Sequence, residues 1–127
     1  MILGIGTDIV NVARMEAALQ RHGEKFARRL LAFSEWDEYR QSAHAGRFLA
    51  KRFAAKEALA KACSTGLRHP VGLQSISITH DALGKPAFDF DVGLADFLKA
   101  HGVVRHHLSI SDEHEMALAF VVLEGEA

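Results

Sequence analysis

The segment that most constrains the fold is residues 47–64, RFLAKRFAAKEALAKACS, because nearly every residue in it favours a helix. Alanine, leucine, arginine, lysine and glutamate have the highest helix propensities, and together they make up most of this stretch. Gly66 lies just past its end, at a position where helices commonly terminate on a glycine. The sequence therefore predicts one long helix, the strongest in the chain.

Shorter helices are predicted on the N-terminal side of this long one. Helical patterns cover residues 12–22 and residues 24–31. Ser34, followed three positions later by Asp37, resembles a capping box, in which two side chains satisfy the free N–H groups at a helix start. We predict that this pair opens a third short helix, which ends near residue 42.

Strands are predicted at the start of the chain and in its second half. The first residues, 2–10, are apolar except near Thr7 and Asp8, which is typical of a buried strand. Later segments alternate apolar and polar residues, as half-buried strands do, at residues 73–80, 87–92, 103–111 and 116–123. A turn at residues 81–86 and a short amphipathic helix at residues 93–101 lie between them.

This order of elements is one strand, a group of helices, a strand pair, a helix and a second strand pair. It predicts an α+β fold with a small, largely antiparallel sheet. The chain length of 127 residues suits one domain covering residues 1–127. A chain this short buries a limited share of its surface, so self-association would add stability.

The composition is that of a soluble globular protein, with 49% hydrophobic and 24% charged residues. No apolar run approaches the ~20 residues that span a bilayer, so we expect no membrane contact. The start, MILGIGTDIV, lacks the positive region of a secretory signal. The single cysteine, Cys63, allows no intrachain disulfide, which is compatible with a cytoplasmic location.

Charge is distributed unevenly along the chain. Residues 1–61 hold 11 Lys and Arg against 7 Asp and Glu, whereas residues 62–127 hold 4 against 9. A basic first half could attract an anionic partner or ligand. The alternative is a dipolar surface without a role, and charge alone does not distinguish the two.

Asp8 is unusual because a carboxylate inside an apolar strand is costly unless it is paired or binds a cation. Gly4 and Gly6 on the same strand would allow another backbone or a ligand to approach closely. The alternative is that Asp8 caps the helix that follows. The Gly-x-Gly pattern is weak by itself, and the full dinucleotide-binding fingerprint is absent.

Glu57 and Lys61 lie four residues apart and therefore share one face of the long helix. The simplest interpretation is an ordinary surface salt bridge, worth about 0.3–0.5 kcal/mol. The same helix is expected to carry a basic surface formed by Arg47, Lys51, Arg52 and Lys56. This surface either is simply solvated or binds phosphate groups.

Two carboxylates from separate elements, with a lysine nearby, also make a plausible magnesium–phosphate site. Magnesium is usually held by one or two carboxylates together with phosphate oxygens and waters. Phosphoryl transfer needs mainly charge neutralisation and positioning. Neither a P-loop nor a paired-cysteine zinc pattern is present.

The eight histidines do not form an obvious metal site. His106 and His107 are adjacent on a predicted strand and would point to opposite faces of it. A single histidine that contacts a phosphate is the better interpretation.

At this point the residues resemble a known family, the holo-acyl-carrier-protein synthases, which are 4′-phosphopantetheinyl transferases. The resemblance covers nearly the whole chain and rests on ordered motifs: GIGTDIV at residues 4–10, LAFSEW at 31–36, RFLAKRFAAKEALAKA at 47–62 followed by STG at 64–66, LGKP at 83–86, and HLSIS at 107–111. Two positions depart from the family pattern. Asp112 stands where the family often has histidine, which leaves the role of residues 112–114 open, including His114. Cys63 stands where an aromatic residue is common.

The resemblance implies an α+β protomer of the 4′-phosphopantetheinyl transferase fold, assembled as a homotrimer with each active site between neighbouring subunits. It implies that Asp8 and Glu57 hold Mg²⁺ against the pyrophosphate of coenzyme A and that Lys61 is the catalytic lysine. Glu57 or a metal-bound water would take the proton of the carrier serine, with Glu35 as a possible residue orienting water.

The same resemblance implies the remaining binding contacts. Arg52 and His107 are candidates for the 3′-phosphate and nearby adenosine atoms, and the turn Gly84, Lys85 and Pro86 would shape the adenine pocket. No nucleic-acid partner is expected. An acyl carrier protein would dock on a basic stripe formed by Arg14, Arg21, Lys25 and Arg28. Gly23 could break the helix that carries this stripe and so divide it.

Two other classes of function compete with this assignment. A metal-dependent nucleotide phosphatase would release inorganic phosphate and need no carrier protein. A non-catalytic coenzyme A-binding module would tolerate loss of Asp8 or Lys61, which the transferase would not.

Overall fold

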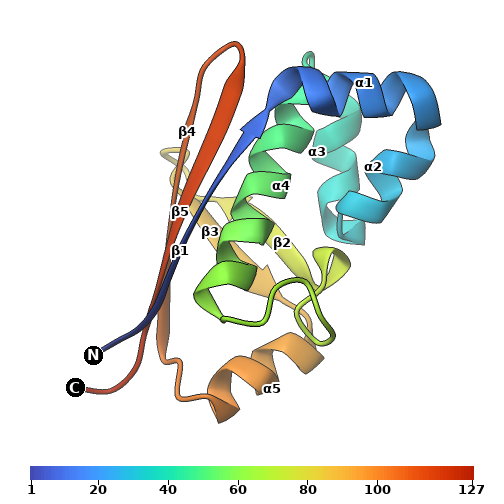
Figure 1. Cartoon of the computed structure of the whole chain (residues 1–127). Coiled ribbons are helices and arrows are strands. Elements are labelled where there is room, and N and C mark those ends of the chain that lie inside the picture. Colours follow the sequence, from blue (N-terminus) through green and yellow to red (C-terminus); the bar gives the residue numbers. More distant parts are fainter.

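Helix α4 (Ala45–Ala62) runs through the middle of the molecule in this computed structural model, which describes residues 1–127 (Figure 1). The helix is present as predicted, shifted by two residues toward the N-terminus. After it, Ser64 and Gly66 have φ angles of 61° and 65°, in the left-handed region that glycine adopts without strain. The N–H of Gly66 donates to the carbonyl of Ala60 at 3.3 Å, so Gly66 helps to end the helix.

A three-stranded antiparallel sheet covers one side of α4. Its strand order is β1–β5–β4, where β1 is Ile2–Asn11, β4 is Arg105–Asp112 and β5 is Met116–Glu124. β4 and β5 form the predicted hairpin. In the middle of the sheet, Ala119 of β5 is paired with Asp8 of β1 on one side and with Ile110 of β4 on the other.

The contact between α4 and β1 is close because both elements present small residues. A Cβ atom on Gly6 would lie 1.9 Å from the carbonyl oxygen of Ala58, and one on Gly4 would lie 2.0 Å from that of Ala62. Only glycine fits at such distances from a helix backbone. This close approach brings Asp8 of β1 beside Lys61 of α4.

The opposite face of this sheet is apolar and exposed. Side chains alternate along a strand, and residues that pack on α4, such as Ala117 and Val121, are fully buried. The residues that point to the opposite face are large and hydrophobic yet exposed. They include Leu3, Ile5 and Ile9 of β1 and Leu118 and Phe120 of β5.

A second antiparallel pair consists of β2 (Ile76–His80) and β3 (Pro86–Phe90). Of these two strands, β3 contacts β4 of the three-stranded sheet. A 3₁₀ turn, η2 (Leu73–Ser75), precedes β2, so the predicted strand at 73–80 begins three residues later. Helix α5 (Val92–Ala100) follows β3 and is capped by Asp91, whose side chain accepts from the N–H of Leu94.

The remaining helices lie on the side of α4 away from the three-stranded sheet (Figure 1). They are α1 (Val12–His22), α2 (Glu24–Leu30), the 3₁₀ turn η1 (Phe33–Glu35) and α3 (Trp36–Gln41). The predicted capping box of Ser34 and Asp37 is wrong, because α3 has no side-chain cap. Instead the Glu35 carboxylate accepts from the N–H of Ala32 at 2.9 Å, and the N-cap of α3 is Glu35, one residue after the predicted Ser34.

The fold is therefore α+β, as predicted, with all strand pairs antiparallel. The strands form two sheets rather than one. None of the helices combines the length and the apolar composition that crossing a bilayer requires.

Candidate active site

Asp8, Glu57 and Lys61 come together where β1 crosses the outer face of α4. The Nζ of Lys61 lies 3.1 Å from Oδ1 of Asp8 and donates to the carbonyl of Thr7 at 3.0 Å. Lys61 thus pairs with the strand carboxylate, and the expected i,i+4 salt bridge with Glu57 is not among the ion pairs formed. Asp8 does not cap α1 either, since Asn11 accepts from the N–H of Ala13 at 2.8 Å and performs that role.

The two carboxylates of this cluster affect each other electrostatically. Desolvation raises the pKa of Glu57, the nearby negative charge of Asp8 raises it further, and Lys61 acts in the opposite direction. A cation placed between two such groups would relieve their repulsion. No group of three or more His, Cys, Asp or Glu side chains is arranged to hold a metal ion. Two carboxylates suffice for magnesium when phosphate oxygens and waters complete its shell, so the donor set fits that ion.

A second polar cluster surrounds a cavity of about 260 Å³ between α4, α3 and the β2–β3 hairpin. It brings together three residues predicted to contact the nucleotide: Arg52, Gly84 and Pro86. It adds residues that the sequence analysis did not assign to a nucleotide. The full lining is Glu38, Phe48, Lys51, Arg52, His80, Gly84, Pro86, Ile110 and Asp112.

Two other predicted nucleotide contacts lie outside this cavity. Lys85 is exposed, and its backbone N–H donates to Oδ1 of Asp81 at 2.9 Å. His107 lies on β4, on the sheet face away from α4, and its Nε2 is 2.5 Å from Oε1 of Glu124. Within one chain, neither residue joins Arg52.

The prediction that Arg47, Lys51, Arg52 and Lys56 form a basic surface is wrong for the last two. The Lys56 side chain is fully buried, and that of Arg52 is 4% exposed. Both point inward because η1 and β2 cover that face of α4 and supply acceptors for them. Arg47 instead extends to Nδ1 of His114 at 3.2 Å.

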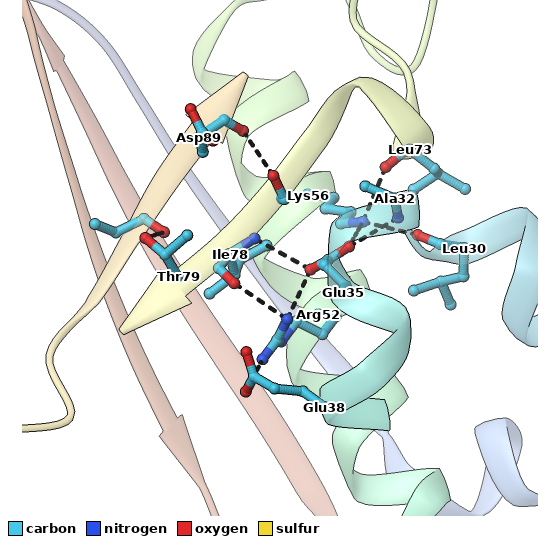
Figure 2. Close-up of polar contacts among 12 residues, drawn as sticks. Leu30, Ala32, Glu35, Glu38, Arg52, Lys56, Leu73, Ile78, Thr79 and Asp89 are labelled. Atoms are coloured by element: carbon cyan, nitrogen blue, oxygen red, sulfur yellow. Dashed lines mark hydrogen bonds and ion pairs between the residues drawn. The ribbon is translucent and has the colours of Figure 1, made fainter. Parts of the chain in front are cut away.

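Glu35 is the shared partner of the two buried cations (Figure 2). Its Oε1 accepts from Nζ of Lys56 at 2.5 Å, and its Oε2 accepts from Nη1 of Arg52 at 2.8 Å and from the N–H of Ile78 at 3.1 Å. Burial lowers the pKa of Lys56 to about 8, and the adjacent Glu35 carboxylate only partly offsets this. The suggestion that Glu35 orients water is therefore wrong, since its side chain is 1% exposed and has four protein donors.

The carboxylate cluster and the cavity around Arg52 lie at opposite edges of the three-stranded sheet. Asp8 is on β1, at one edge, whereas the cavity is lined by Ile110 and Asp112 of β4, at the other. β5 separates the two strands, so they are about 10 Å apart. A ligand that touches both clusters must reach across this distance or bridge two copies of the chain.

The basic residues predicted to bind a carrier protein are all exposed on α1 and α2. Gly23, with φ at 63°, ends α1 and begins α2, so the four side chains do not lie on one continuous helix. Arg28 is 3.8 Å from Glu24, and its guanidinium lies over the Trp36 ring at 4.7 Å.

A family model described as the 4′-phosphopantetheinyl transferase superfamily matches residues 4–121 of this chain. The chain belongs to this superfamily. It is similar to the holo-[acyl-carrier-protein] synthase of Nitrosospira multiformis, with 58% identity over 98% of this chain and 99% of the relative.

Solved structures of this superfamily share the fold. The crystal structure of holo-[acyl-carrier-protein] synthase from Neisseria meningitidis superposes with a TM-score of 0.95 at 48% identity, covering 98% of this chain and 99% of that one. A holo-(acyl-carrier-protein) synthase from Bacillus anthracis, in complex with CoA (3′,5′-ADP), superposes with a TM-score of 0.82 at 36% identity, covering 99% of each chain.

Sequence reasoning missed three polar residues that line the cavity around Arg52, namely Glu38, His80 and Asp112. Partial desolvation and the Arg52 guanidinium lower the pKa of His80. No local pattern distinguishes these residues, because each comes from a different element. Asp112, whose role the sequence left open, lies in the cavity wall.

Proposed function

We propose that this protein transfers the 4′-phosphopantetheine group of coenzyme A to a serine hydroxyl of an apo-acyl carrier protein. The products are the holo-acyl carrier protein and adenosine 3′,5′-bisphosphate. The main support is the convergence of Asp8, Glu57 and Lys61 in a chain that is 58% identical to a holo-[acyl-carrier-protein] synthase. We place this reaction in fatty acid and lipid biosynthesis in the cytoplasm, and the single cysteine is compatible with that compartment.

The direct test is to incubate the protein with coenzyme A, Mg²⁺ and an apo-acyl carrier protein, and to weigh the carrier by mass spectrometry. We expect the carrier to gain one 4′-phosphopantetheine group. Release of inorganic phosphate with an unchanged carrier would indicate a phosphatase instead. Binding of coenzyme A without any product would indicate a non-catalytic module.

In the proposed mechanism, Asp8 and Glu57 hold Mg²⁺. When bound there, the ion would supply positive charge that offsets the negative charge of the coenzyme A pyrophosphate. The serine oxygen attacks the phosphorus that carries the pantetheine arm, and the bond to the bridging oxygen breaks. That oxygen remains on the departing adenosine 3′,5′-bisphosphate.

Lys61 is positioned to neutralise or protonate this leaving group. Its ammonium is half exposed and is held by Asp8 and the Thr7 carbonyl, so it can face a ligand without leaving its position. Glu57, whose pKa is raised, is the candidate within the chain for accepting the serine proton.

The cavity around Arg52 is the proposed site of the adenosine and its 3′-phosphate. Arg52 and Lys51 provide positive charge there, while Gly84 and Pro86 shape its edge. Lys85 and His107, which lie outside the cavity of their own chain, would act from a neighbouring protomer or after a side-chain movement.

A shared active site would reconcile the separation of the two clusters with one ligand. We infer that the active unit is a homotrimer in which the Asp8 cluster of one protomer faces the Arg52 cavity of another. The apolar outer face of the three-stranded sheet supports self-association, since monomeric soluble proteins rarely expose large apolar patches.

Mixing two inactive variants should restore activity if the site is shared. We expect Lys61→Ala and Gly84→Val each to be impaired, the second because valine is disfavoured at the φ of 89° found there. After subunits are dissociated and reassociated, some mixed interfaces will carry neither defect, so activity should exceed that of either parent. Mixed assemblies that stay inactive despite proven subunit exchange, or a fully active monomer by light scattering, would refute the shared site.

The basic surface of α1 should affect carrier binding and leave coenzyme A binding nearly unchanged. We expect Arg14→Glu with Arg21→Glu to slow association with an acidic carrier protein, because rim charges act mainly on the association rate. The measurement is stopped-flow association at low salt, with calorimetry of coenzyme A in parallel.

A matched control for this pair is Arg68→Glu with Lys99→Glu. Both residues are exposed and lie outside α1 and α2, and the net charge changes by the same amount. If the two double variants associate with the carrier at equal rates, the docking surface has been assigned to the wrong helices.

A further inference from the structure

The Arg52 guanidinium is held differently on its two sides (Figure 2). On the inner side, Nη1 donates to Glu35 at 2.8 Å and to the carbonyl of Ile78 at 3.1 Å. Glu35 is buried and also binds Lys56, so this attachment is part of the core. The Phe48 ring, with its centroid 4.3 Å from Cζ, further restricts the plane of the guanidinium.

On the outer side, Nη2 of Arg52 donates to Oε2 of Glu38 at 3.1 Å. The Glu38 side chain is 58% exposed, in contrast to the 1% exposure of Glu35. The Arg52 side chain itself is 4% exposed, so only the Glu38 end of this pair lies in solvent. A carboxylate in solvent forms a weak ion pair and rearranges more readily than a buried one. The outer contact of Arg52 is thus the one that another anion can replace.

Glu38 also stands in the wall of the cavity that Arg52 lines. The wall carries positive charge from Lys51 and Arg52 and negative charge from Glu38 and Asp112. A phosphate that enters the cavity meets Nη2 of Arg52 already occupied by a carboxylate. Carboxylates and phosphates bind the same guanidinium edge, so the two compete directly.

We propose that Glu38 is a built-in competitor for the phosphate bound by Arg52, and that it lowers the affinity of this site for phosphorylated nucleotides. This inference rests on the proposed adenosine pocket and adds a residue that sets its affinity. Weaker nucleotide binding would favour release of adenosine 3′,5′-bisphosphate after transfer. Product inhibition by that nucleotide should accordingly increase when the Glu38 charge is removed.

The test is calorimetric titration of wild type and Glu38→Gln with adenosine 3′,5′-bisphosphate and with adenosine 5′-monophosphate. We expect Glu38→Gln to bind the bisphosphate about two- to fivefold more tightly, which is the range expected when a weak ion pair no longer competes. The gain should be much smaller for the monophosphate, which lacks the 3′-phosphate. If Glu38 affected folding alone, the substitution would change the affinities for the two nucleotides by the same factor.

Asp112→Asn provides the matched control. It removes one negative charge from the same cavity wall, yet Asp112 makes no hydrogen bond to Arg52. An equal gain in the two variants, an equal gain for the two nucleotides, or no gain at all would overturn the competition with Glu38. If wild type fails to bind the bisphosphate, the proposed pocket itself is wrong and the inference falls with it.

Discussion

Replacing Asp8 or Glu57 by alanine is expected to reduce phosphopantetheine transfer by about 10²–10³-fold or more, in the range seen when one group that stabilises transition-state charge is removed. Each change takes one anion from the proposed magnesium site and leaves the pyrophosphate under-neutralised. The fold should survive, because both side chains lie at the edge of β1 and the outer face of α4. Transfer should be followed by mass spectrometry of the carrier over a range of Mg²⁺ concentrations.

Metal affinity provides a second readout that does not depend on turnover. We expect both variants to bind Mn²⁺, used as a spectroscopic substitute, more weakly than wild type, while their unfolding midpoints change little. Glu126→Ala, which removes an exposed carboxylate near the C-terminus, should match wild type in both assays. Near-normal turnover of a folded Asp8→Ala or Glu57→Ala protein at low Mg²⁺ would contradict the assignment of the metal ligands.

Replacing Glu35 by alanine should lower the free energy of unfolding by about 3–5 kcal/mol, the usual cost of breaking a buried ion pair from one side. The change leaves Lys56 and Arg52 buried without their shared counter-ion. It also leaves the N–H groups of Ala32 and Ile78 without an acceptor. Urea denaturation at pH 7 is the measurement.

Glu38→Gln is the control for this prediction, since it removes the exposed partner of the same arginine. Its expected cost is at most about 1 kcal/mol. If Glu35→Ala costs no more than Glu38→Gln, then Glu35 does not hold this part of the core together.

The difference in the free energy of unfolding between wild type and Glu35→Ala should narrow as the pH rises. The pKa of Lys56 is about 8 in the folded protein, below its ordinary value of 10.5. Between these values the unfolded chain binds more protons, so the contribution of Lys56 to stability rises with pH. The charge and hydrogen bond of Glu35 raise this pKa, so the pKa of Lys56 is lower in Glu35→Ala than in wild type. The pH range in which stability rises therefore begins at lower pH in the variant. Denaturation at pH 7 and pH 9.5 tests this, and a constant difference between the proteins would argue against it.

The helices were predictable because their signals are local. Residue propensities and Gly66 located α4 to within two residues, and α1 was predicted with its observed bounds. The strand pairs followed from alternation and from the turns between them. The start of α3 was not predictable in this way, because the group that satisfies Ala32 is the Glu35 side chain, which is fixed by contacts with α4 and β2.

The candidate site was predictable to a different degree at each residue. Helical spacing showed that Glu57 and Lys61 share a face, and the resemblance to a known family linked them with Asp8. Spacing did not show that Lys61 pairs with Asp8, because that requires β1 to lie against α4. The proposed roles of Arg14, Arg21, Lys25 and Arg28 in carrier binding stay predictions.

Local order along the chain was sufficient to specify the helices, the strand pairs and the α+β class, since each depends on residues close in sequence. Three-dimensional packing was needed to show which side of α4 each charge occupies. Arg52 and Lys56 look like surface cations in the sequence, yet η1 and β2 cover them and Glu35 neutralises their charge. Glu38 and Asp112 reach one cavity wall from α3 and β4 for the same reason. A helical repeat defines which residues share a face, whereas burial depends on what the rest of the chain packs against that face.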